Sequence, residues 1–169
     1  MLRSFGSIMC SYLLSLLSVI AANATLVLPT LCSALCSTPA TITTAGTIIN
    51  TNVDTDTYNN HQSCLWTITA PDGLYPTITI SSLATEPYYD YFRVYDGSSI
   101  DSPLLFSKSG FTQGLPTVTG SQSTMTVTFT SDISIVKAGV VAVVGFSEQA
   151  GTDSPPPVTD PSEPLSLLP

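Results

Sequence analysis

The sequence predicts an all-β fold, an antiparallel β-sandwich, on three observations. Only 9% of the 169 residues are charged, whereas Thr, Ser and β-branched residues are abundant, a composition that favours strands. Apolar and polar residues alternate with a period of two in several short runs, as in strands that bury one face. Turn-forming Gly, Asp and Pro separate these runs, and no segment shows the periodicity of an amphipathic helix. Many short strands at this spacing are typical of a sandwich.

The first segment, residues 1–24, has the features of a secretory signal peptide. Arg3 provides a basic start, residues 8–22 are apolar, and the Ala-Asn-Ala sequence at residues 22–24 predicts cleavage before Thr25. An uncleaved membrane anchor is the alternative, but the apolar stretch is short for a bilayer and contains several Ser. We therefore expect a secreted, extracellular product with no membrane span in the mature chain.

Secretion determines what the cysteines do. Cys10 would leave with the signal peptide, so Cys32, Cys36 and Cys64 would remain in an oxidising compartment. A Cys36–Cys64 disulfide would contribute about 3.6 kcal/mol in the chain-entropy model. We expect Cys32 to be the spare thiol because it lies nearest the mature N-terminus, where chains are loose. Capping by glutathione and a disulfide-linked dimer through Cys32 both stay open.

Residues 32–148 are predicted to form one β domain. In four runs, apolar residues occupy alternate positions, so each run should be a strand with one face in the core. These core positions are Cys64, Trp66 and Ile68; Ile78 and Ile80; Phe92 and Val94; and Met125, Val127 and Phe129. A fifth run, residues 138–146, is apolar on both faces and predicts a central strand buried on both sides. Residues 149–169 are rich in proline and predict an extended, disordered tail.

The charge balance and the lack of catalytic motifs limit the classes of function that the sequence supports. Acidic residues outnumber basic ones 12 to 4, which argues against nucleic acid and favours a cationic partner or a divalent metal. The chain contains one histidine and lacks a nucleophile elbow, a zinc-type cluster and a phosphate-binding glycine loop. The sequence therefore predicts a protein that is not an enzyme.

The functional site is expected around residues 85–97. Glu86 and Asp90 lie four residues apart just before a predicted strand, and carboxylates of this kind suit a hard cation. At this point the sequence resembles the CUB domain family, a family of extracellular sandwich modules. The motifs that carry the resemblance are, in chain order, Cys36, residues 46–49, 58–60, 64–68 and 70–73, Glu86, residues 89–97 and 129–134, and Gly139.

The resemblance implies a jelly-roll-like sandwich and a possible Ca²⁺ site. In calcium-binding CUB domains the metal ligands are a Glu before the Tyr-Asp segment, the Asp of that segment and an Asp after the penultimate strand. These positions match Glu86, Asp90 and Asp132, with Tyr58 supporting the Glu and the backbone carbonyl of Ser134 as a further ligand.

The chain also departs from the CUB pattern in its disulfides. CUB domains usually carry a second disulfide, and its two positions hold Pro87 and Ser109 here. Losing that link should remove a few kcal/mol of constraint on the loop that carries Glu86, roughly 2–4 kcal/mol by the usual range.

The acids need a neutralising partner if they converge. Two carboxylates about 4 Å apart repel by roughly 4 kcal/mol at an effective dielectric near 20. Calcium could neutralise them, or the basic side chain of Lys137 or Arg93 could. Alternatively, the acids do not converge and each is solvated.

Tyrosines flank the acids, at positions 88, 89 and 91. Partly exposed tyrosines beside carboxylates suit the recognition of a Lys or Arg, although Tyr88, Tyr89 and Tyr91 could also simply cover the sheet edge. The function expected from these features is binding of an extracellular protein ligand through its basic side chain. A structural or self-associating coat protein and a carbohydrate-binding protein are the alternatives.

Overall fold

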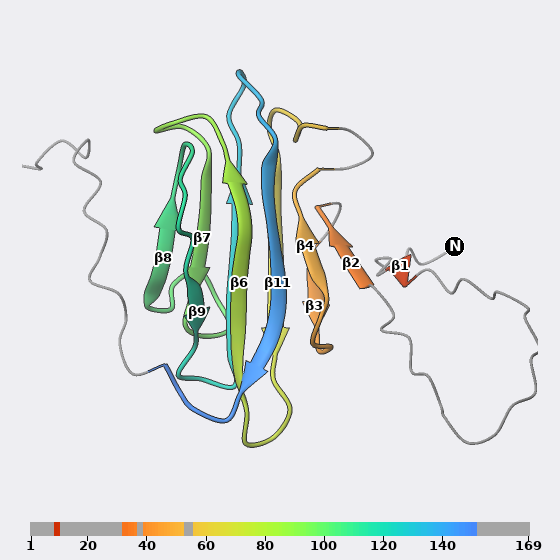
Figure 1. Cartoon of the computed structure of the whole chain (residues 1–169), viewed down its shortest axis with the longest axis vertical. Coiled ribbons are helices and arrows are strands. Elements are labelled where there is room, and N and C mark those ends of the chain that lie inside the picture. The colour runs from red at the N-terminus through yellow and green to blue at the C-terminus, as the bar shows by residue number, and fades with distance from the viewer. Residues whose placement is uncertain (1–8, 11–31, 37–38, 53–55, 152–169) are drawn as a thin grey trace, which may run out of the picture.

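The protein is a sandwich of two β-sheets, which confirms the predicted fold class. The computed structural model describes residues 9–10, 32–36, 39–52 and 56–151, and every regular element among them is a strand (Figure 1). No helix in this part of the chain is therefore available to cross a bilayer. Buried residues from both sheets form one continuous hydrophobic core between them.

The first sheet has six strands, with β11 and β6 at its centre (Figure 1). Its order is β1 (Met9–Cys10), β2 (Cys32–Leu35), β4 (Ile48–Asn50), β11 (Gly139–Ser147), β6 (Tyr75–Ala84) and β9 (Thr117–Thr119). Only the β2–β4 pair of this sheet is parallel. The β6–β11 ladder is the longest, and its register shifts between Val141 and Ala142, which indicates a β-bulge.

The second sheet has five strands, with β10 at its centre. Its order is β3 (Ala40–Ile42), β5 (Ser63–Thr69), β10 (Thr124–Thr130), β7 (Tyr91–Tyr95) and β8 (Leu104–Lys108). The β3–β5 pair is parallel, and the other neighbours are antiparallel. Thr130 at the end of β10 pairs with Ser63 on one side and with Tyr91 on the other. The ends of three strands therefore meet at one place.

The predicted core positions are confirmed. In β5, β7 and β10 the alternate apolar residues face the other sheet, and Trp66, Phe92 and Phe129 are fully buried. The facing positions on the first sheet include Ile78 and Ile80. A period of two with one apolar face is what a sheet of a two-layer sandwich requires.

The two central strands differ from the expectation in opposite ways. β11 is central, as predicted, but its second face is half-buried and not fully buried, as at Val141 and Val143. By contrast, Thr126 and Thr128 of β10 were expected on a solvated face and are buried. They are flanked on both sides by residues of β5 and β7, and Thr126 Oγ1 donates a hydrogen bond to Gly97 O at 2.8 Å.

The predicted Cys36–Cys64 disulfide is present, with 5.1 Å between the two Cα atoms. Cys10 and Cys32 are partners in the β1–β2 register, whereas the state of the Cys32 thiol falls outside what the structure describes. The rest of the predicted signal peptide and the tail from residue 152 onward also lie outside the described residues. Signal cleavage, the disordered tail and a Cys32-linked dimer remain predictions.

Candidate metal centre

Three loops meet at the upper end of the sandwich in Figure 1. Residues 56–62 precede β5, residues 85–90 join β6 to β7, and residues 131–138 join β10 to β11. The strand order places β10 between β5 and β7, so these loops are neighbours although they are far apart in the sequence. Each loop contributes to one polar cluster.

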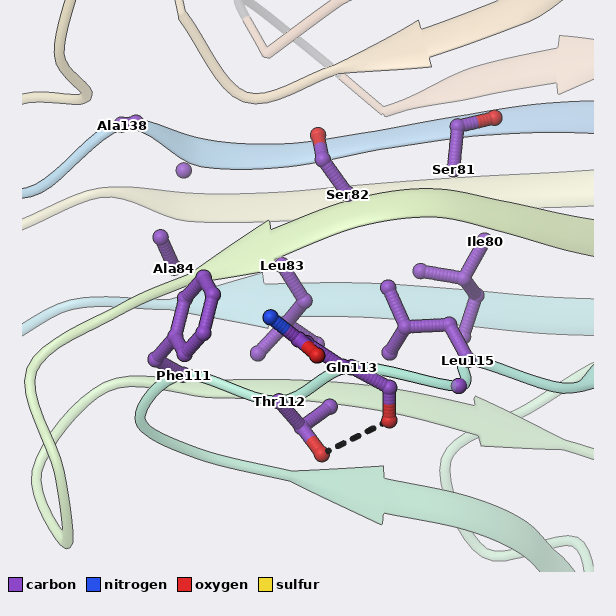
Figure 2. A pocket seen from close by; sticks show the side chains of 12 residues that line it. Ile80, Ser81, Ser82, Leu83, Ala84, Phe111, Thr112, Gln113, Leu115 and Ala138 are labelled. Carbon is purple, nitrogen blue, oxygen red and sulfur yellow. Dashed lines mark hydrogen bonds between the residues drawn. The ribbon is translucent and has the colours of Figure 1, made fainter.

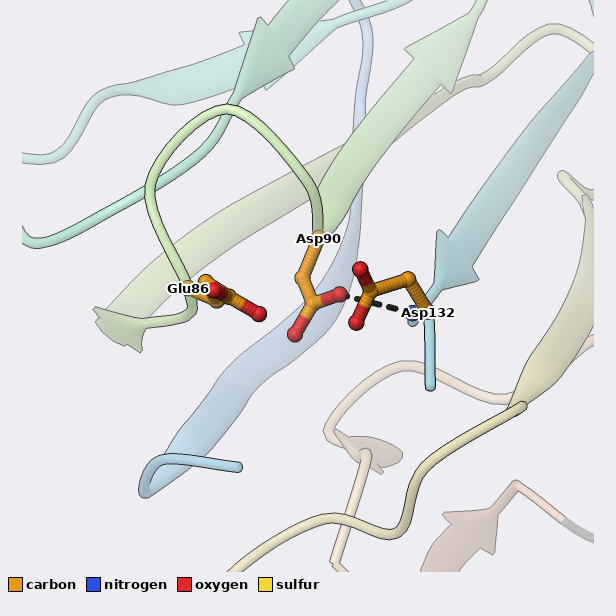
Figure 3. A group of neighbouring side chains, drawn as sticks. All are labelled: Glu86, Asp90 and Asp132. Atoms are coloured by element: carbon orange, nitrogen blue, oxygen red, sulfur yellow. Dashed lines mark hydrogen bonds between the residues drawn. The ribbon is translucent and has the colours of Figure 1, made fainter. Parts of the chain in front are cut away.

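The structure brings together Glu86, Asp90 and Asp132. One carboxylate oxygen from each lies within 4.8 Å of the other two, and Figure 3 shows the three side chains pointing toward one another. Asp90 is fully buried, Glu86 is 6% exposed and Asp132 is half-buried. The possibility that the acids do not converge is therefore wrong.

The Asp90 carboxylate is held by hydrogen bonds at both oxygens. The Asp132 amide donates to Oδ1 at 2.8 Å, and the Tyr58 hydroxyl donates to Oδ2. These bonds fix the distance between the loop that follows β10 and the loop that precedes β7. Asp90 thus occupies the centre of the cluster.

Tyr58 connects all three loops through its hydroxyl. Besides its bond to Asp90, the hydroxyl accepts a hydrogen bond from the Glu86 amide at 3.0 Å and lies 3.2 Å from the carbonyl oxygen of Ile135. Its ring is buried and packs edge-on against Phe129, with 5.0 Å between the ring centroids. Burial, followed by the hydrogen bond to Asp90, raises the pKa of Tyr58, so the hydroxyl remains a neutral donor. Tyr58 therefore contacts the backbone of Glu86, and its role in supporting a metal ligand remains a prediction.

Glu86 carries an unpaired oxygen. Its Oε2 atom is buried and has no hydrogen-bond partner. Burial raises the pKa of the Glu86 carboxyl, and the charges of Asp132 and Asp90 raise it further. A buried acceptor without a donor is costly, and its negative charge faces two others. Carboxylate oxygens of this kind are suitable ligands for a hard divalent cation such as Ca²⁺.

Ser134 orients Asp132 through its amide. The Ser134 amide donates to Asp132 Oδ1 at 2.9 Å. The sequence pointed instead to the carbonyl of Ser134 as a metal ligand, and that role remains a prediction.

Neither candidate basic side chain neutralises the cluster. Arg93 packs over the ring of Tyr91, with its Cζ atom 4.3 Å from the ring centroid, and donates to Thr130 Oγ1 at 3.4 Å. Lys137 is exposed, and its charge lowers the pKa of Glu86 by less than either aspartate raises it. Within the described residues, the negative charge of the site therefore exceeds the positive charge that Arg93 and Lys137 supply to balance it.

The backbone is strained in each of the three loops. The non-glycine residues with positive φ in the described part of the chain are His61 (57°), Tyr88 (70°) and Ile135 (53°). A β-branched residue such as Ile135 is rarely found in this region, and such strain persists only where the surroundings impose it. The His61 amide donates to Asp132 O at 2.7 Å, so this loop also belongs to the site.

Exposed apolar side chains occur on the same loops. Tyr88 is 60% and Tyr89 62% exposed, and Ile133 and Ile135 are also exposed. Tyr91 is half-buried, and Arg93 of the same chain covers its ring. Of the three predicted tyrosines, Tyr88 and Tyr89 are thus open to a partner. The two isoleucines were not anticipated from the sequence.

Two hydroxyl groups near Glu86 were also missed. Ser109 Oγ contacts the backbone of Glu86 and Tyr88, and Thr85 Oγ1 contacts the backbone of Asp90 and Gly110. The sequence identified Ser109 only as a position where a cysteine was expected. Serine and threonine form such local backbone bonds readily, but nothing in the sequence identifies their partners.

A groove of about 590 Å³ lies beside the C-terminal end of β6, the end from which the loop with Glu86 begins (Figure 2). The exposed ring of Phe111 stands over Ala84, and Leu83 and Leu115 lie along the groove. Its size is within the usual range for ligand pockets, but it contains no cluster of titratable side chains.

Comparison with known proteins agrees with this architecture. Residues 36–143 match the family described as CUB domain. The chain belongs to the CUB domain family. CUB domains are extracellular protein-interaction modules, and as such they are binding modules and not catalytic ones.

Similar CUB-containing proteins are much longer than this chain. Tolloid-like protein 2 of Mus musculus is 36% identical over 102 residues, which cover 58% of this chain and 10% of that protein. Cubilin of Sus scrofa is 34% identical over 89 residues, covering 48% of this chain and 2% of cubilin. The chain thus spans a tenth or less of the length of these two relatives.

Two solved structures resemble this CUB domain. The full extracellular region of zebrafish Gpr126/Adgrg6 matches with a TM-score of 0.57 and 26% identity over 67% of this chain and 15% of that one. The CUB1-EGF-CUB2 domains of rat MASP-1 match with a TM-score of 0.57 and 22% identity over 65% of this chain and 43% of that one. The second likeness shows the shared fold alone.

Proposed function

We propose that this CUB domain is a secreted module that binds an extracellular protein ligand through an acidic site organised by Ca²⁺. The observation that carries the proposal is the buried, unpaired Oε2 atom of Glu86 within a cluster of three carboxylates. A cation at this place would satisfy the orphaned oxygen and remove the repulsion between the acids.

Glu86, Asp90 and Asp132 would hold the ion with carboxylate oxygens. The carbonyl of Ser134 and water molecules would complete the six to eight oxygens that calcium takes. Tyr58 and the Ser134 amide hold two of these carboxylates in place before any metal arrives. Such preorganisation lowers the ordering cost of binding.

The ligand side of the site suits a lysine or arginine. Three carboxylates and one divalent ion leave a net charge of about −1 at the site, by the usual ionisation of acids at neutral pH. Tyr88 and Tyr89 expose their rings on the loop that carries Glu86 and Asp90. Aromatic rings beside a residual negative charge attract a cationic side chain and also contact its aliphatic stem.

A two-stage amide NMR titration tests the proposal. Calcium is added to the protein first, and N-acetyl-lysine amide is added second; a parallel sample contains EDTA. Calcium should shift the amides of residues 85–86, 88–90 and 131–135, and the lysine analogue should then shift those of Tyr88 and Tyr89. In EDTA the analogue should shift neither, because repulsion from Asp90 and Asp132 displaces the Glu86 carboxylate, whose Oε2 atom no hydrogen bond holds in place.

Matched variants separate the site from general effects of charge. Asp132→Asn removes one charge but keeps the oxygen that accepts the Ser134 amide, so the fold should persist while both responses disappear. Asp101→Asn removes the same charge from an exposed turn between β7 and β8, at the other end of β7, and should respond like wild type. The proposal fails if calcium shifts no loop amide in wild type, or if ε-acetylated lysine binds as well as lysine.

A further inference from the structure

The loop that carries Glu86 and Asp90 crosses from one sheet to the other. It leaves β6 in the first sheet at Ala84 and enters β7 in the second sheet at Tyr91. Within the loop, the Asp90 amide donates to Glu86 O at 3.2 Å. Because a crossing loop is part of no sheet ladder, its shape depends on other contacts.

Ser109 fixes the peptide groups on both sides of Pro87. Its Oγ atom donates to Glu86 O at 3.2 Å and accepts a hydrogen bond from the Tyr88 amide at 2.5 Å. Tyr88 is one of the residues with positive φ, so the bond to Ser109 helps to hold a conformation that the residue disfavours. Ser109 directly follows β8, which pairs with β7 and is therefore a rigid base.

Thr85 fixes the two ends of the same loop. Its Oγ1 atom donates to Asp90 O at 2.9 Å and accepts a hydrogen bond from the Gly110 amide at 2.8 Å. The Thr85 amide also donates to Gly110 O at 3.0 Å. Thr85 is buried, so water does not compete for these bonds.

We infer that the hydroxyls of Thr85 and Ser109 are positioning groups that hold Glu86 and Asp90 in the geometry that binds the metal. The inference rests on the proposed calcium site. Pro87 and Ser109 occupy the positions where a second disulfide would be expected, so the two hydroxyls restrain this loop where a covalent link is missing.

The consequence is a specific effect on metal affinity. Without a hydroxyl, the loop samples other shapes, and calcium must order it on binding, which weakens the measured affinity. Loss of one hydroxyl with its hydrogen bonds should weaken calcium binding by about threefold to tenfold, from the usual net strength of a hydrogen bond. A purely structural role would lower the unfolding temperature and leave the affinity of the folded protein unchanged.

Calorimetric titration of the full chain with Ca²⁺, well below its unfolding temperature, measures this effect. Ser109→Ala and Thr85→Val remove the hydroxyls, whereas Ser109→Thr and Thr85→Ser keep them and should restore wild-type affinity. Ser107→Ala is the matched control, because Ser107 is also half-buried and lies two residues earlier, in β8. Amide hydrogen exchange in EDTA reports the loop without metal, and Ser109→Ala should accelerate exchange at Tyr88 and Asp90.

The results that would contradict the positioning role differ from the results that would contradict the proposed calcium site. If wild type binds calcium and Ser109→Ala binds it equally well, the positioning role is wrong while the calcium site stands. If wild type binds no calcium, the proposed function falls and the inference falls with it. Unchanged exchange of the Tyr88 amide in Ser109→Ala also overturns the inference, because the hydroxyl then does not hold the loop.

Discussion

Glu86 lies where its own charge is disfavoured. Its carboxyl is buried near Asp90 and Asp132, and one of its oxygens has no donor. The identity of the three acids was expected from the family resemblance. Their convergence could not be derived from spacing, because Asp132 lies far along the chain from the other two. The unpaired oxygen depends on where Tyr58 and the loop amides direct their hydrogen bonds, which no local pattern encodes.

The raised pKa of Glu86 predicts how stability depends on pH in the metal-free protein. The folded state binds the Glu86 proton more tightly than the unfolded state, whose carboxyl titrates near about pH 4.3. The contribution of the Glu86 carboxyl to the free energy of unfolding is therefore fully present below about pH 4.3. It is lost as the pH rises through the pKa that Glu86 has in the folded state. In EDTA, the free energy of unfolding of wild type minus that of Glu86→Gln should fall as the pH rises toward neutral.

Urea unfolding of the two proteins across this pH range measures the difference directly. Added calcium should reverse the trend, because it binds the ionised carboxylate and competes with the proton. A difference that rises with pH in EDTA would mean that the cluster favours the charged form of Glu86.

For the individual strands, the sequence predicted which face lies in the core. It predicted less well how exposed the opposite face is. Alternation located the core side of β5, β7 and β10 because it is a local property of an extended chain. The burial of Thr126 in β10 and the half-exposure of Val141 in β11 depend on neighbouring strands. Strand order is set by tertiary packing, and periodicity contains no information about it.

The start of β11 gives a prediction at this scale. Gly139 has φ +78°, and a Cβ atom there would overlap Thr51 Oγ1 and Asn52 Oδ1. Thr51 Oγ1 accepts the Val140 amide, and Asn52 Nδ2 donates to Ala138 O, so these side chains anchor the strand. Gly139→Ala should therefore lower the free energy of unfolding by about 2–5 kcal/mol, from backbone strain plus overpacking.

Gly46 is the control for backbone strain alone. It has φ +80°, but a Cβ atom there meets nothing within 4 Å. Gly46→Ala should cost about 1–2 kcal/mol, the usual penalty of a left-handed conformation. Urea unfolding of both variants provides the comparison, and equal losses would show that the contacts of Gly139 do not matter.

At the scale of the whole molecule, the Cys36–Cys64 disulfide joins the beginning of the domain to the second sheet. Cys36 precedes β3, Cys64 lies in β5, and these two strands are parallel neighbours. The pairing was predictable because Cys32 lies nearest the expected mature N-terminus. What the link restrains became clear only from the sheet order.

Removing this disulfide should destabilise the domain by about 3.6 kcal/mol, for a sequence separation of 28 residues in the chain-entropy model. The double variant Cys36→Ala/Cys64→Ala and reduced wild type should lose similar amounts in urea unfolding with EDTA present. Reduced wild type keeps both sulfur atoms, whereas the double variant lacks them. Equal losses in the two proteins would therefore show that the lost stability comes from the covalent link and not from the packing of the sulfur atoms. A double variant as stable as wild type would show that the core and ladders alone hold the β3 segment.

The sequence by itself determined the strands, their core faces, the disulfide and the acids that could bind a metal. The strands and their core faces follow from residue type and local spacing, because alternation and turn residues act over a few residues. The disulfide follows from the position of Cys32 near the expected mature N-terminus, and the three acids follow from the resemblance to CUB domains. Tertiary structure alone decided that β10 lies between β5 and β7, and so that Tyr58, Asp90 and Asp132 meet. It also decided that Ser109 supports the loop of Glu86. Contacts between distant loops depend on strand order, which the packing of the whole sandwich selects.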